Sequence, residues 1–167
     1  MPSDAQLLRL AQRVGRRLLH TQRRLATAES CTAGWIAKAL TDVAGSSRWF
    51  ECGWVVYADA AKRRDLGVSA AALARHGAVS ESVARQMVRG ALVRAGVDVA
   101  VAVTGIAGPD GGSPAKPVGT VWFAVALRRG RRLEIAATRA RFGGNREQVR
   151  RKSVSRALKL VLALAPG

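Results

Sequence analysis

Val97-Asp98-Val99-Ala100-Val101-Ala102-Val103 runs directly into Thr-Gly-Ile-Ala-Gly-Pro-Asp-Gly-Gly-Ser-Pro-Ala-Lys-Pro (104–117), and this junction decides the fold. The first stretch is apolar except for Asp98, which is typical of a central strand covered on both faces. The second is so rich in glycine and proline that we expect a long loop without regular structure. Long loops at strand ends often carry functional residues.

Helical and extended patterns alternate on both sides of this junction. We expect helices at 4–22, 33–41, 60–66, 69–75, 80–95 and 146–164, and strands at 25–28, 53–57, 97–103, 118–127 and 133–140. Asp59, Ser80 and Asn145 are the expected N-caps of three of these helices, and the last two strands should form a hairpin. This order predicts an α/β fold, a single domain over residues 1–167 with a central mixed sheet flanked by helices.

The composition suits one intracellular domain. With 167 residues, of which 49% are hydrophobic, the chain can bury one sizeable core. No apolar run approaches the roughly 20 residues of a membrane span, and the polar start is unlike a secretory signal, so we expect a cytoplasmic protein without a membrane partner. Cys31, Cys52, His20 and His76 lack the spacing of metal ligands, and we expect neither a metal, another cofactor nor a disulfide.

The net charge of +17 raises the alternative of a nucleic-acid partner. The arginines, however, are spread over several predicted helices and turns, and no stacking aromatics lie among them. We therefore expect a solvated basic surface that adheres nonspecifically to polyanions at low salt and has no specific nucleic-acid partner.

Ser30 lies between a predicted strand and a predicted helix. A serine in this position can present its oxygen at the sheet edge, close to the free amides of the helix. The alternative is an ordinary N-cap serine, and this residue alone favours the N-cap.

Tyr57 and Lys62 flank a second strand-to-helix junction, so a phenol and an amine can converge on one pocket. A lysine acts as a base only where burial or nearby cations favour its neutral form, and it would then take a proton from Ser30 directly or through Tyr57. A tyrosine packed in the sheet and an exposed helical lysine are the alternatives. The glycine-rich loop from Thr104 to Gly112 likewise either holds a phosphate or carboxamide or is a structural Ω-loop.

Four blocks of sequence carry a resemblance to a known family. They are Thr-Ala-Glu-Ser-Cys-Thr-Ala-Gly (27–34), Gly-Ala-Val-Ser-Glu (77–81), Thr-Gly-Ile-Ala-Gly-Pro-Asp-Gly-Gly (104–112) and Lys-Pro-Val-Gly-Thr-Val-Trp (116–122). In this order they resemble the CinA C-terminal domain family, and the similarity runs from about Leu7 to Leu162. Relatives often have two glycines where this chain has Ala33-Gly34.

The family includes stand-alone amidohydrolases of nicotinamide mononucleotide, which release nicotinate mononucleotide and ammonia in the salvage of pyridine nucleotides (NAD). The resemblance implies that Ser30 is the nucleophile and that Tyr57 and Lys62 assist it. Backbone amides near Cys31 and Thr32, or between Gly105 and Gly108, would stabilise the oxyanion. The candidate substrate-binding residues are Thr32, Ser46, Ser80, Thr104, Gly105, Gly108 and Arg146, with a cation preferred for the phosphate.

The resemblance also suggests a homodimer or higher homo-oligomer, with four tryptophans available to an apolar interface: Trp35, Trp49, Trp54 and Trp122. All four could instead lie in the core. Two functional alternatives remain from the sequence. One is a noncatalytic nucleotide-binding or interaction module linked to competence or DNA damage, and the other is an amidase for a related substrate.

Overall fold

The computed structural model describes residues 1–164, and its centre is strand β3 (Val99–Gly105), which is buried up to its last residue. On one side of β3 lie β1 (Leu25–Glu29) and then β2 (Phe50–Val55), both parallel to it. On the other side lie β4 (Thr120–Arg129) and β5 (Arg132–Arg141), which form an antiparallel hairpin. The carboxyl ends of three neighbouring parallel strands therefore share one edge of the sheet.

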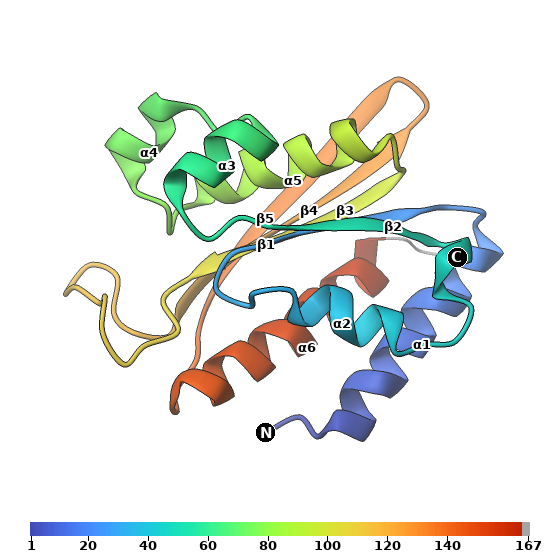
Figure 1. Ribbon diagram of the computed structural model, residues 1–167, viewed down its shortest axis with the longest axis horizontal. Helices are drawn as coiled ribbons and strands as arrows, with labels where there is room; N and C mark the ends of the chain where they lie inside the picture. The colour runs from blue at the N-terminus through green and yellow to red at the C-terminus, as the bar shows by residue number, and fades with distance from the viewer. Residues whose placement is uncertain (165–167) are drawn as a thin grey trace.

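Helices cover both faces of this sheet, as Figure 1 shows. One layer consists of α1 (Asp4–His20), α2 (Trp35–Thr41) and α6 (Arg146–Leu164). The other consists of α3 (Asp59–Leu66), α4 (Ala70–His76) and α5 (Glu81–Ala95). Two hydrophobic clusters result, one on each face, because the side chains of β3 alternate between the layers. The predicted α/β fold with a mixed sheet is confirmed; residues 165–167 of the predicted domain lie outside the described residues.

Two of the three predicted N-caps are confirmed. The hydroxyl of Ser80 accepts a hydrogen bond from the Val83 amide at 3.3 Å, and the side chain of Asn145 accepts one from the Gln148 amide at 3.0 Å. The prediction for Asp59 is wrong, because this residue is the first residue of α3 and Ala58 occupies the N-cap.

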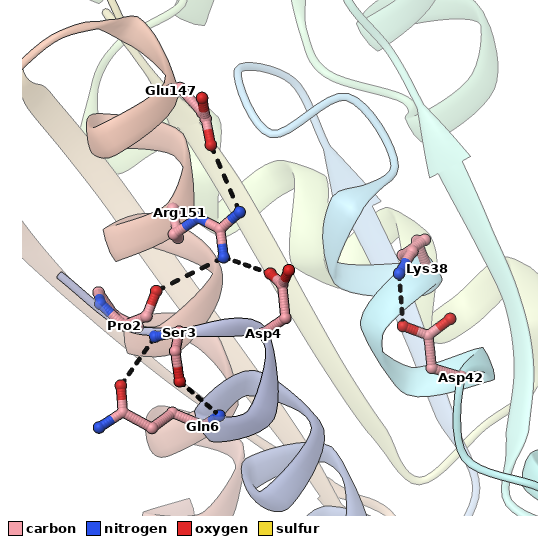
Figure 2. Close-up of polar contacts among 8 residues, drawn as sticks. All are labelled: Pro2, Ser3, Asp4, Gln6, Lys38, Asp42, Glu147 and Arg151. Carbon is pink, nitrogen blue, oxygen red and sulfur yellow. Dashed lines mark hydrogen bonds and ion pairs between the residues drawn. The ribbon is translucent and has the colours of Figure 1, made fainter.

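The amino terminus is tied to α6 through Arg151, as Figure 2 shows. Its guanidinium donates to the Asp4 carboxylate, to the Pro2 carbonyl at 3.5 Å and to Glu147 at 3.3 Å. Only 14% of the Arg151 side chain is exposed, but its partners Asp4 and Glu147 are 86% and 65% exposed, so each ion pair contributes little and the stabilisation comes from the three contacts together. α1 is therefore anchored where the chain begins.

Trp49 lies in the core, 2% exposed, against Gly15, where a Cβ atom would come within 2.8 Å of the indole. The expectation that it contributes to an interface between subunits is therefore wrong for Trp49. The other three tryptophans are partly exposed. In the described part of the chain, Cys31 and Cys52 are free thiols, no three potential metal ligands gather, and no helix is suited to cross a membrane.

Candidate active site

Ser30 directly follows β1 at the shared edge of the parallel strands. Its amide donates to the Val103 carbonyl of β3 at 3.0 Å, and the residue is 8% exposed. The chain then turns sharply, with the Ala33 amide donating back to the Ser30 carbonyl at 3.1 Å. Helix α2 starts only at Trp35 and has Gly34 as its N-cap without a side-chain contact. The alternative that Ser30 is an ordinary N-cap is therefore wrong.

Glu29, and not Ser30, caps the start of α2. Its carboxylate is fully buried and accepts hydrogen bonds from the amides of Ile36 at 3.0 Å and Ala37 at 2.9 Å. Burial raises the pKa of Glu29, while these two amides and the Thr32 hydroxyl act in the opposite direction. Glu29 was not among the predicted site residues, although an acidic residue at the end of an apolar strand is the signal that could have identified it.

Lys62 and Tyr57 meet at the neighbouring strand end. The Val56 amide donates to the Glu29 carbonyl at 2.9 Å, which places Tyr57 next to the Ser30 segment. The Lys62 ammonium donates to the Tyr57 carbonyl at 2.7 Å and lies 3.4 Å from the Asp59 carboxylate. Lys62 is 1% exposed and Tyr57 60% exposed, so the alternatives of an exposed lysine and a packed tyrosine are both wrong. The contact involves the carbonyl of Tyr57 and not its phenol.

Arg146 connects Tyr57 to the glycine-rich loop. One of its nitrogens contacts the Tyr57 hydroxyl at 3.1 Å, and another donates to the Gly108 carbonyl at 2.8 Å. Gly108 has a φ of +83°, and a Cβ there would lie 2.6 Å from Val118. At Gly105 a Cβ would come within 2.9 Å of the Thr120 carbonyl. Close packing therefore requires glycine at both positions. The Arg146 guanidinium joins the glycine-rich loop to the start of α6.

Arg150, one turn further along α6, holds the turn that follows Ser30. Its Nε donates to the Cys31 carbonyl at 3.1 Å and its Nη2 to the Thr32 carbonyl at 3.0 Å. Arg150 was not among the predicted site residues, because its contact with Thr32 spans 118 residues, a separation for which a single sequence gives no signal.

The remaining predicted binding residues are differently placed. Ser46 lies in a short 3-10 turn before β2, next to the start of β1, and therefore at the opposite edge of the sheet. Ser80 caps α5 and donates to the Gly77 carbonyl at 2.9 Å, and the Thr104 hydroxyl donates to the Ala78 carbonyl at 2.9 Å. Thr32 is buried within the turn. Thr104 lies at the carboxyl end of β3 beside Gly105, and its contact with Ala78 brings the segment that ends in Ser80 to the same edge. The structure thus places all the predicted site residues at or next to this edge except Ser46.

Cys31 neighbours Ser30 but is poorly suited to act as a nucleophile. The thiol is buried, and burial raises the pKa of Cys31 to about 12, in spite of the nearby guanidinium groups of Arg150 and Arg146. A thiol in this state stays protonated at neutral pH, and the thiolate is the reactive form. This leaves the Ser30 hydroxyl as the nucleophile candidate in the turn.

Comparison with known proteins finds relatives over nearly the whole chain. Residues 7–165 match the sequence model of the CinA C-terminal domain. The chain is 51% identical over 157 residues to the nicotinamide-nucleotide amidohydrolase PncC of Escherichia coli (strain K12), covering 94% of this chain and 93% of that protein. PncC of Pseudomonas putida is also 51% identical, over 93% of this chain and 94% of its own length.

Solved structures of similar sequence have the same fold as this chain. The competence/damage inducible protein CihA from Agrobacterium tumefaciens superposes with a TM-score of 0.93 at 43% identity, covering 99% of this chain and 98% of that one. The resemblance predicted from the four sequence blocks is confirmed, and the chain belongs to the CinA C-terminal domain family.

Proposed function

We propose that this protein is an amidohydrolase that converts nicotinamide mononucleotide to nicotinate mononucleotide and ammonia, with Ser30 as the nucleophile. The observation that carries the proposal is the burial of Lys62 at the strand end beside Ser30. An ammonium group at 1% exposure is costly to keep, and its contact with the Tyr57 carbonyl, at the strand end next to the Ser30 segment, suits chemistry better than stability. The relatives named nicotinamide-nucleotide amidohydrolase, 51% identical over nearly their whole length, support the choice of substrate.

In the proposed reaction, the Ser30 oxygen attacks the carboxamide carbon while the hydroxyl proton passes to Lys62. Lys62 then returns this proton to the departing nitrogen, which leaves as ammonia and gives an acyl ester on Ser30. Water adds to the ester, Lys62 again accepts and returns a proton, and nicotinate mononucleotide is released. Asp59, 3.4 Å from the Lys62 nitrogen, stabilises the ammonium form between the two transfers.

Backbone amides would stabilise the oxyanion that forms on the carboxamide oxygen. The Ile106 amide is already engaged by the Thr120 carbonyl at 2.9 Å, so we favour the turn after Ser30 over this part of the glycine-rich loop. Arg146 is the proposed phosphate partner, because its guanidinium joins the exposed Tyr57 phenol to Gly108 and can exchange one of these contacts for the substrate. No step of this scheme uses a metal.

The test is to incubate the purified protein with nicotinamide mononucleotide and to measure ammonia and nicotinate mononucleotide. We expect turnover by the wild type and its loss in Ser30→Ala. Ser69→Ala is a matched control, because this hydroxyl caps α4 by accepting from the Ala72 amide at 3.1 Å, away from the Ser30 turn. It should cost about 1 kcal/mol of stability and no activity. Wild-type protein that releases no ammonia, or Ser30→Ala that keeps turnover, would contradict the proposal.

We also propose the wider setting of this reaction. The free thiols of Cys31 and Cys52 suit a reducing compartment, and we assign the enzyme to pyridine nucleotide salvage in the cytoplasm. We propose a homo-oligomer, most simply a dimer, in which the partly exposed Trp35, Trp54 and Trp122 remain candidates for the interface. A mass of 17.7 kDa in solution at moderate salt would show a monomer and remove this part of the proposal.

A further inference from the structure

We propose that Arg150 is a positioning residue for the nucleophile turn, defined as residues 30–34. Its guanidinium fixes two consecutive carbonyls of this turn and so keeps the Ser30 oxygen where it can attack. This inference rests on the proposed function in one respect, the role of Ser30 as the nucleophile.

The contacts of Arg150 suit orientation more than charge balance. Nε and Nη2 belong to one planar group, and they donate to the carbonyls of Cys31 at 3.1 Å and Thr32 at 3.0 Å. Two parallel bonds from a rigid fork fix the direction of both peptide groups, which a single point charge cannot do. The turn is thereby attached to α6, an element far away in the sequence.

The nucleophile turn needs such a restraint. Ala33 has a φ of +51°, in the left-handed region that residues with a side chain rarely adopt, and Gly34 follows with a φ of +87°. Backbone of this kind persists only where the surroundings hold it in place. Within the turn itself, the backbone contacts are Ala33 to Ser30 at 3.1 Å and Trp35 to Thr32 at 3.1 Å. Arg150 adds donors from outside to the same short segment.

The indole of Trp35 restrains the Arg150 guanidinium. The Arg150 guanidinium lies 5.4 Å from the centre of the indole, and Trp35 is the first residue of α2, so the turn, α2 and α6 meet at one point. A cation over an indole face is attracted by the ring, which favours a single orientation of the fork.

Arg151 offers a matched control on the same helix. Its guanidinium also lies over Trp35, at 4.9 Å, but its hydrogen bonds go to Pro2, Asp4 and Glu147, away from the nucleophile turn (Figure 2). Replacing Arg151 therefore removes an arginine from the same aromatic ring and leaves both turn carbonyls bound. A loss of activity that occurs on replacing Arg150 but not Arg151 is therefore attributable to the nucleophile turn.

The experiment compares Arg150→Lys, Arg150→Gln and Arg151→Gln in two measurements on the full-length protein. The first is kcat and KM for nicotinamide mononucleotide, and the second is amide hydrogen exchange in the peptide that covers residues 30–37. For both Arg150 variants we expect kcat to fall about a hundredfold with little change in KM, because a small displacement of the attacking atom costs about this much. Exchange in the peptide should become faster. Arg151→Gln should lower the melting temperature and leave both measurements near the wild-type values.

The two measurements separate this inference from the proposed function. If the wild type does not hydrolyse nicotinamide mononucleotide, the proposed function fails, and the exchange data alone decide whether Arg150 holds the turn. Unchanged exchange in both Arg150 variants overturns the inference. So does a kcat within about threefold of the wild type in Arg150→Lys, since a change that small is the size expected of an ordinary surface substitution. Equal loss of kcat in Arg151→Gln would also overturn it, because the effect would then be general to α6.

Discussion

Replacing Lys62 tests the proton transfers of the proposed reaction. Lys62→Arg keeps a positive charge but cannot release its proton at accessible pH, so a residue that must be neutral in part of the cycle is lost. General base catalysis contributes about 100-fold or more to rate, and a loss of that size corresponds to about 2.7 kcal/mol at the transition state. We therefore expect kcat for nicotinamide mononucleotide to fall at least about a hundredfold.

Because Lys62 is buried, replacing it can lower activity by destabilising the fold, and this effect must be separated from a loss of catalysis. A guanidinium is larger than an ammonium, and overpacking at a site 1% exposed costs about 1–3 kcal/mol. Lys62→Met avoids this extra volume. It leaves the Tyr57 carbonyl without its donor at 2.7 Å, at a cost of about 1–3 kcal/mol, and it removes the burial of an ammonium group, which acts in the opposite direction. We expect the fold to survive and the activity to be lost.

The assay is ammonia release at several pH values, with a thermal melt of each variant to confirm folding. Ser30→Ala combined with Lys62→Met should cost little more than either change alone, because groups that act as one unit are not additive. If folded Lys62→Arg turns over within about threefold of the wild type, far less than base catalysis contributes, the proton acceptor is another group. Independent, additive losses in the double variant would likewise separate Lys62 from Ser30.

Three further predictions follow from the environment of the site. Because burial raises the pKa of Glu29 above 4.5, the folded chain binds more protons than the unfolded chain just above this pH. The free energy of unfolding should therefore decrease as pH rises from 4.5 through the raised pKa, and Glu29→Gln should lose this slope in urea titrations. Cys31 should resist iodoacetamide in the native protein, and Cys31→Ser should keep its turnover, since a thiol with a pKa of about 12 takes no part in catalysis. Excess EDTA should leave activity intact; inactivation that zinc or magnesium reverses would contradict the serine mechanism.

The elements of the fold were predictable because their signals are local. The apolar run around Val101 identified the central strand, and the two-residue turn Gly130-Arg131 joins β4 to β5 within the predicted hairpin. Ser80 and Asn145 cap the helices they were expected to cap, because a capping side chain contacts amides two or three residues further on. The position of Ser46 away from the site was also predictable. Ser46 precedes a strand, and a residue before a parallel strand lies at the opposite edge of the sheet from one that follows a parallel strand.

The positions of charged groups in the site were not predictable in the same way. Lys62 lies in the polar stretch Lys-Arg-Arg-Asp, which is typical of a solvated helix face, yet it is 1% exposed in the structure, where its ammonium contacts the Tyr57 carbonyl and α3 packs against α5. Glu29 reaches amides seven and eight residues ahead, across a turn whose shape the sequence does not give. Both depend on tertiary packing, which overrides the local pattern.

The free-energy cost of burying Glu29 and Lys62 also indicates where the site is, independently of the resemblance to a family. Among the described residues, Glu29 and Lys62 are the buried side chains that end in a carboxyl or an amino group, and they lie next to Ser30 and Tyr57 at adjacent strand ends. Burying either group is costly, and apolar residues of similar volume would serve the core at least as well. Local rules of stability fail most often where a chain performs its function. The cost is concentrated at the edge where Ser30 and the glycine-rich loop follow the neighbouring strands β1 and β3, which is the reason to look for the chemistry there and not along the basic surface.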